Sequence, residues 1–125
     1  MRYFSMVLIV ASVIGLPLQA QPEVEWMRLY GDEVVDQFFA HIQTEDGGWA
    51  FAGRKGSRPA TQWVVKTDQD GEEQFQGQYT IDDESAVAHE LVQAEDGGYV
   101  IAGSISIDEG VRCSGIRVDE GGEQI

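Results

Sequence analysis

Short apolar stretches separated by polar turns rich in glycine and aspartate make up most of the chain after residue 20. Trp49-Ala50-Phe51-Ala52 alternates large and small side chains, which is the period of a β-strand whose two faces differ. Trp63-Val64-Val65 is a continuous apolar run, as expected of a strand buried on both faces. The pattern predicts strands near 24–30, 37–43, 48–54, 62–67, 74–79, 86–93, 98–107 and 113–118.

An internal repeat is the strongest feature of the sequence. Gln43–Gly53 recurs as Gln93–Gly103, an offset of 50, with seven of eleven positions identical. Residues 25–30 resemble residues 74–79, and residues 66–72 resemble residues 117–123. Residues 82–91 have some helical propensity, but their alignment with residues 38–43 favours a strand. A period of this length is typical of solenoids, propellers and other repeat arrays.

Two glycine-rich turns mark the repeat. Glycine tolerates positive φ and aspartate hydrogen-bonds to its own turn, so both residues favour tight hairpins. We therefore predict structural turns at Asp46, Gly47 and Gly48 and, in the second copy, at Asp96, Gly97 and Gly98.

The phrases around Tyr30-Gly31, Asp46-Gly47-Gly48, Ala52-Gly53 and Trp63-Val64-Val65-Lys66 resemble the repeats of bacterial and archaeal secreted β-propeller-like proteins. The second copy departs from that pattern, with Thr80 in place of the glycine and Ser114 in place of the tryptophan. The resemblance implies an all-β fold of two four-stranded antiparallel propeller-type blades, in repeats 21–72 and 73–125, with no shared catalytic residues.

Two blades do not close a propeller, which typically takes about four to eight. We therefore expect that the chain begins a longer product or, alternatively, that copies self-associate through blade edges; the first is favoured. Two open blades expose apolar faces and strand edges. The isolated chain is accordingly expected to be unstable, oligomeric or prone to aggregation.

The N-terminal residues 1–20 have the pattern of a secretory signal peptide. Arg2 supplies the positive charge, residues 6–16 form an uncharged apolar core, and Ala20 precedes the predicted cleavage point. An uncleaved N-terminal anchor is the alternative. The pattern predicts a secreted, periplasmic or cell-surface protein without membrane insertion of the mature chain.

Net charge narrows the classes of partner. The chain has 22 acidic and 8 basic residues, a formal net charge of −14 at pH 7. Such a surface repels phosphate backbones, which argues against nucleic acid as a partner. Solubility is the favoured role of the charge over attraction of cations. A protein or a glycan remains the expected ligand.

Few residues have the spacing of a functional site. Asp68 and Asp70 are candidate calcium ligands, although a hairpin turn with solvated carboxylates is the favoured interpretation. His41 and His89 lie 48 apart, outside the repeat register, and Cys113 has no catalytic partner at motif spacing. No catalytic residue and no cofactor other than calcium is predicted.

The leading functional hypothesis is an exported, non-catalytic module for binding or scaffolding. The alternative is part of a secreted propeller enzyme whose active site lies in blades outside this sequence. The repeat and the lack of a catalytic constellation favour the first hypothesis.

Export predicts a processed chain. Mass spectrometry of the extracytoplasmic fraction should find a protein that starts at Gln21, because small Ala20 precedes the cut. Intact Met1 on a cytosolic protein would contradict export.

Overall fold

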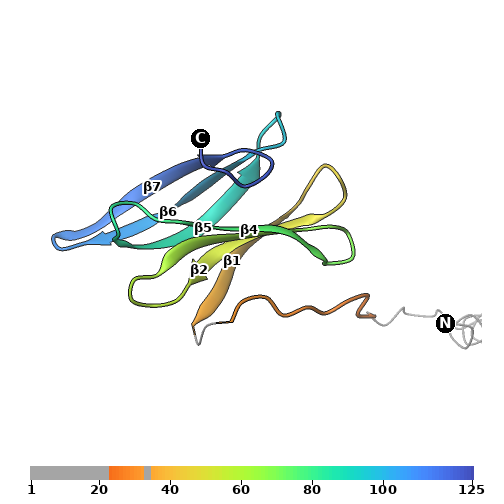
Figure 1. The fold of residues 1–125 in the computed structure, drawn as a ribbon, viewed down its shortest axis with the longest axis horizontal. Coiled ribbons are helices and arrows are strands. Elements are labelled where there is room, and N and C mark those ends of the chain that lie inside the picture. The colour runs from red at the N-terminus through yellow and green to blue at the C-terminus, as the bar shows by residue number, and fades with distance from the viewer. Residues whose placement is uncertain (1–22, 33–34) are drawn as a thin grey trace, which may run out of the picture.

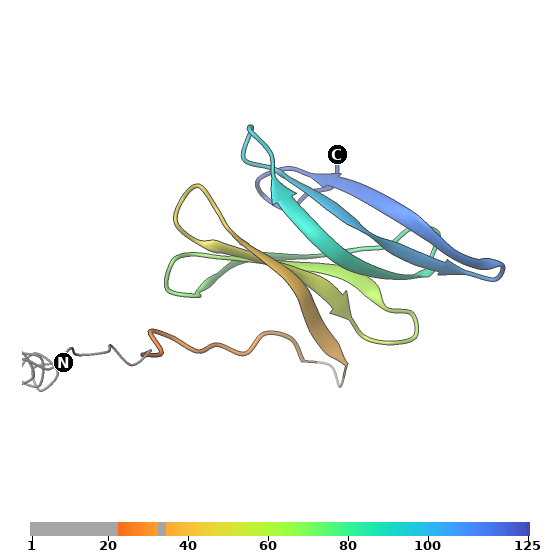
Figure 2. The same cartoon turned by 180° about the vertical axis from the view of Figure 1, so that it is seen from behind.

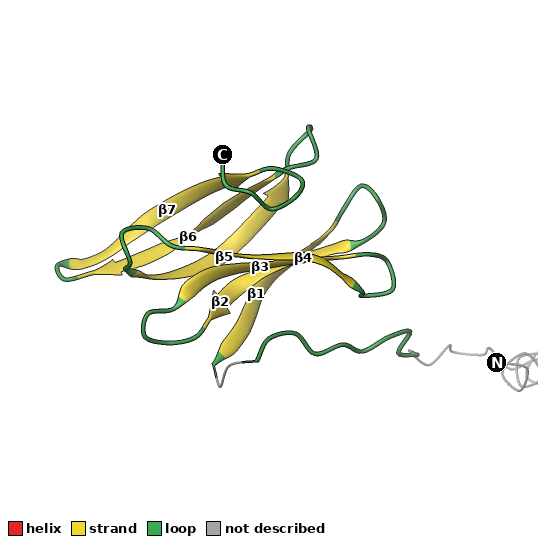
Figure 3. Ribbon diagram, in the orientation of Figure 1, coloured by secondary structure: helices red, strands yellow, loops and turns green. Residues whose placement is uncertain are grey.

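The computed structural model describes residues 23–32 and 35–125, and the predicted signal peptide lies outside them. The described residues form strands and loops and contain no helix, as Figure 3 shows. The strands are β1 (Asp36–Gln43), β2 (Trp49–Lys55), β3 (Thr61–Thr67), β4 (Glu73–Tyr79), β5 (Ser85–Gln93), β6 (Tyr99–Ile107) and β7 (Gly110–Val118).

The strands make two antiparallel sheets that lie face to face (Figures 1 and 2). The first has the order β1-β2-β3-β4 and the second the order β5-β6-β7. Each sheet follows the chain, so every strand pairs with its neighbour in sequence. The all-β prediction with two antiparallel sheets is confirmed.

The core lies between the sheets and is asymmetric. The first sheet contributes the small side chains of Ala50, Ala52 and Val64, all fully buried. The second sheet contributes large side chains, among them Tyr99 and Ile101. Small residues on one face let large residues of the facing sheet approach its backbone, which gives close packing.

A β-bulge sits at the same place in each sheet and explains the Ala-Gly pairs of the repeat. The register shifts at Phe39 in β1, opposite Gly53, and at His89 in β5, opposite Gly103. A Cβ on Gly53 would lie 1.8 Å from the carbonyl oxygen of Gln37. The corresponding distance at Gly103, to the carbonyl oxygen of Val87 on the neighbouring strand β5, is 2.1 Å. Only glycine fits opposite these bulges.

Two parts of the sequence-based prediction are wrong. Residues 24–30 form no strand and have no strand partner among residues 23–32 and 35–125, so the first predicted strand is not found there. Residues 73–79 close the first sheet as β4, so the second sheet has three strands where four were expected. The segment 82–91 enters β5, as its alignment with β1 favoured. In the described part of the chain, no helix is long and apolar enough to cross a membrane.

We predict that Gly53→Ala lowers the free energy of unfolding by about 1–3 kcal/mol, because its Cβ overlaps a backbone carbonyl that is fixed by the bulge. Gly115→Ala is the matched control: its Cβ meets nothing within 4 Å, and the change should stay within about 0.5 kcal/mol. Urea unfolding of both variants measures the difference. Equal destabilisation would contradict the close approach.

Candidate binding surfaces

Both Asp-Gly-Gly segments form the tight turns of a hairpin. Asp46 Oδ1 accepts a hydrogen bond from the Gly48 N–H at 3.0 Å, and Asp96 does the same with Gly98 at 3.0 Å. The first glycine of each turn has positive φ, 85° at Gly47 and 88° at Gly97. The second lies against the next strand: a Cβ on Gly48 would be 2.1 Å from the Thr67 carbonyl oxygen. These residues therefore have structural roles.

A buried lysine ties the first turn to its sheet. Lys66 Nζ donates to Asp46 Oδ2 at 3.0 Å, to the Thr67 carbonyl at 2.7 Å and to Gln74 Oε1 at 2.7 Å. These contacts use all three ammonium protons. Hydrogen bonds from Thr44, the Gly48 amide and Lys66 lower the pKa of Asp46 to about 2.

The second turn has a similar but less complete arrangement. Arg117 takes the place of Lys66 and pairs with Asp96. Hydrogen bonds from the Gly98 amide and from Arg117 lower the pKa of Asp96. Among the described residues, Arg117 Nη1 is buried and has no hydrogen-bond partner. The second sheet thus lacks the contact that Gln74 of β4 supplies to Lys66.

A cavity of about 440 Å³ opens between the two sheets at the turn end. It is lined by Asp46, Lys66, Gln74 and Phe75 from the first sheet's side and by Gln93, Tyr99 and Glu120 from the second's. Lys66 and Asp46 are already paired with each other, and burial raises the pKa of Tyr99 to about 12. Near neutral pH the Asp46 carboxyl stays ionised and the Tyr99 hydroxyl stays protonated, so neither group exchanges protons readily in that range.

A second cavity, of about 650 Å³, lies beside the loop 56–59 and has Lys55 and Arg58 as the basic residues of its lining. Lys55 Nζ contacts Asp32 and lies 3.2 Å from Asp36 Oδ2, and it sits 5.1 Å from the Trp63 ring centroid. Lys55 is thereby neutralised by two carboxylates. The exposed Arg58 is the remaining cation in the lining.

The candidate calcium ligands lie in the β3–β4 turn. Asp68 Oδ1 accepts hydrogen bonds from the amides of Asp70 at 2.9 Å and Glu72 at 3.0 Å. Asp119 repeats this pattern with Gly121 and Glu123. The described residues contain no group of three or more His, Cys, Asp or Glu placed to hold a metal ion. The Asp68 carboxylate is engaged by its own turn, and calcium binding stays a prediction.

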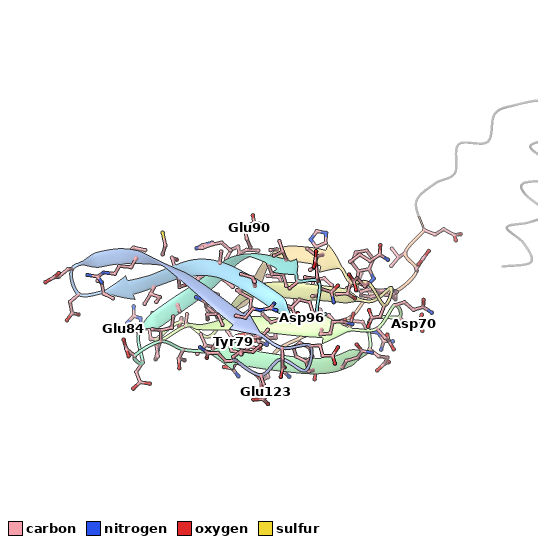
Figure 4. All side chains as sticks on the ribbon, turned by 90° about the horizontal axis from the view of Figure 1, so that it is seen from above. Asp70, Tyr79, Glu84, Glu90, Asp96 and Glu123 are labelled. Carbon is pink, nitrogen blue, oxygen red and sulfur yellow. The ribbon has the colours of Figure 1, made fainter. Side chains whose placement is uncertain are left out.

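The acidic side chains are dispersed over the molecule. Figure 4 shows Asp70 toward one end and Glu84 toward the other. The remaining candidate residues are also separate. His89 contacts Ser104 Oγ at 3.0 Å, His41 packs beside Trp49 and Phe51, and Cys113 is exposed on β7.

Residues 24–31 run along the free face of the first sheet, against the β3–β4 turn. Trp26 Nε1 donates to the Gln69 carbonyl at 3.1 Å, and the Tyr30 hydroxyl donates to the Gly71 carbonyl at 2.5 Å. The Tyr30 ring also packs 5.9 Å from the Phe51 centroid. The opposite side of this segment points to solvent, with Met27 79% and Leu29 96% exposed.

The outer face of the second sheet is a second uncovered surface. Val92 is 57% and Val100 40% exposed, and Ala102 and Gly115 beside them are also exposed. Within the described residues, β7 has a strand neighbour on its β6 side only, apart from one bridge between Val118 and Gln124. The sequence analysis expected exposed apolar faces and strand edges, and this outer face of the second sheet is one such surface.

Acid titration should reveal the Asp46 interaction. A carboxyl whose folded pKa is depressed stabilises the fold above its unfolded pKa, and this stability disappears as pH falls through the folded value. Unfolding free energy should therefore fall between about pH 4 and pH 2, and Asp46→Asn should flatten that fall. The size is modest because the Asp46 side chain is 56% exposed.

The control for this titration is Asp70→Asn, which removes the same charge from a carboxylate without a hydrogen bond or ion pair among the described residues. It should keep the wild-type slope in urea unfolding at each pH. Parallel curves for wild type and Asp46→Asn would rule out the proposed contribution.

Comparison with known proteins assigns no role to these surfaces, so their geometry is the basis for interpreting them. No protein-family model matches the chain, and no curated protein matches it.

Proposed function

We propose that this chain is an exported, non-catalytic binding or scaffolding module made of two propeller-type blades, and that it binds extended protein segments at the edge of β7. The sequential strand order of each sheet supports the comparison with blades. So does the packing of β5, the first strand of the second sheet, against β1, β2 and β3. Export rests on the pattern of residues 1–20.

The observation that carries the proposal is the open edge of β7. Val118 pairs with Tyr99 as Thr67 pairs with Trp49, so β7 is the counterpart of β3. In the first sheet β3 is covered by β4, whereas in the described part of the chain the outer edge of β7 has only the two-residue contact with Gln124 and Ile125. An uncovered strand edge presents amide and carbonyl groups that can pair with an added strand.

This edge favours a polypeptide ligand over a glycan. Strand addition takes most of its affinity from main-chain hydrogen bonds, which a sugar cannot reproduce in register. The aromatic rings that could form a sugar platform are largely engaged with one another: Phe38 lies 4.7 Å from Trp63 and 5.1 Å from Phe51, centroid to centroid.

A binding role also suits the charged groups. In the two larger cavities of the described chain, Lys66 and Lys55 are each held by aspartates. Such neutralised pairs position loops, whereas acid–base catalysis requires a group that exchanges protons near the working pH. The proposal therefore includes no cofactor and no catalytic residue.

We predict that the full chain selects extended peptides from a random peptide library displayed on phage. Bound peptide should slow amide hydrogen exchange along β7, because its amides gain partners, while the β4 edge serves as the internal control. Binding of soluble polysaccharides is measured in parallel, because a glycan is the alternative class of ligand. Protection of β4 instead of β7, or binding of polysaccharides alone, would overturn the assignment.

A further inference from the structure

The segment 24–30 is related to β4 by contacts as well as by sequence. The Tyr79 hydroxyl donates to the Gly122 carbonyl at 2.6 Å, as Tyr30 donates to Gly71. The Phe75 ring lies over Gly122 as the Trp26 ring lies over Gly71. Residues 26 and 30 precede 75 and 79 by 49 positions. The segment thus lies against the first sheet as β4 lies against the second.

The two situations differ in one respect. While β4 packs over the second sheet, its backbone pairs with β3 of the first sheet. Residues 24–30 pack in the same way over the first sheet but have no strand partner in the described chain. They have the position and the sequence of a fourth strand whose own sheet is missing.

We propose that this sheet is β5-β6-β7 of a second copy of the chain, so that residues 24–30 of one copy pair antiparallel with β7 of the next. This inference rests on the proposed function: it takes the β7 edge as the binding site and identifies a second copy of the chain as the ligand. The register follows from β3 and β4, where Lys66 pairs with Phe75 and Gln62 with Tyr79. It places Trp26 opposite Arg117, Leu29 opposite Ser114 and Tyr30 opposite Cys113.

The charges of the residues that would meet between residues 24–30 and β7 agree with this register. Glu25 takes the position of Gln74, the side chain that accepts from Lys66. It would face Arg117, whose buried Nη1 has no partner among the described residues. Within one copy, Gln124 and Ile125 occupy the edge of β7 where the strand would pair. They make one bridge, to Val118, and one 2.9 Å hydrogen bond, from the Ile125 amide to the Arg117 carbonyl. A seven-residue strand replaces that short contact.

The faces of the two copies also match. Pairing brings the outer face of one second sheet against the free face of the next first sheet. Val92, Val100 and Ala102 on that outer face are the equivalents of Ile42, Ala50 and Ala52, which are wholly or partly buried within one copy. The contact between copies would therefore repeat the contact between sheets. Such a head-to-tail contact generates closed rings or filaments.

The test measures the mass of the full chain by sedimentation velocity across a concentration series, in 0.15 and 0.5 M salt, with its N-terminus determined by mass spectrometry. Assemblies of several copies are expected, and they should grow at higher salt, which screens the repulsion between acidic chains. The double variant Met27→Pro/Arg28→Pro should be monomeric, since adjacent prolines cannot pair in a strand.

The matched control is Met27→Gln/Arg28→Gly, which reproduces Gln76 and Gly77 of β4 and loses the same arginine. It should assemble like the wild type. A chain that is monomeric at all concentrations, or prolines without effect, would overturn the proposal. If peptides still protect β7 in that monomer, the proposed function survives and only the second copy is excluded.

Cross-linking fixes the register. In a Cys113→Ser background, Leu29→Cys with Ser114→Cys should form disulfides between copies. Leu29→Cys with Val111→Cys should not, because three strand residues separate Val111 from Ser114 by about 10 Å. Equal cross-linking of both pairs, or a disulfide within one copy, would contradict the stated pairing.

Discussion

The close approach of two unlike sheet faces is the constraint on which the molecule depends. Alanine and valine on the first sheet leave room for tyrosine, isoleucine and leucine on the second, and both sets are almost fully buried. A larger residue at Ala50 or Ala52 would push the sheets apart, and a smaller one at Tyr99 would leave a void. In the first Ala-Gly pair Ala52 faces the other sheet, whereas Ala102 of the second pair is exposed on the outer face; in both pairs the glycine admits the bulged neighbour.

The turns keep these strands in register through a different interaction. A carboxylate fixed by its own turn amides, and by a cation from the third strand, connects the loop to the sheet at Asp46 and again at Asp96. Lys66 needs β4 to complete its contacts, whereas Arg117 remains incomplete. The second turn, whose arginine lacks a partner, thus belongs to the sheet that lacks a fourth strand. The hydrogen bonds of the turn therefore depend on whether a fourth strand is present.

Local pattern was enough to place seven strands and both Asp-Gly-Gly turns, because alternation and turn chemistry act within a few residues. Pairing could not be predicted in the same way. In a periodic chain any point can be taken as the start of the repeat, and the motif at Trp26 and Tyr30 was placed in the first unit. The first sheet begins at β1, twelve residues after Val24, and Trp26 and Tyr30 contact the β3–β4 turn without entering that sheet.

The position of residues 24–30 outside the first sheet explains where the candidate surfaces lie. An outer strand that pairs within one sheet and packs on the following sheet connects the two sheets. Because the strand always belongs to the first sheet and packs on the second, the connection has one direction. Within the chain, β4 does both. Residues 24–30 do only the packing and β7 offers only the pairing, so the two open surfaces are the halves of one interface. In the assembly proposed above, this complementarity gives the contact between copies a direction, and a directional contact suits the proposed scaffolding role.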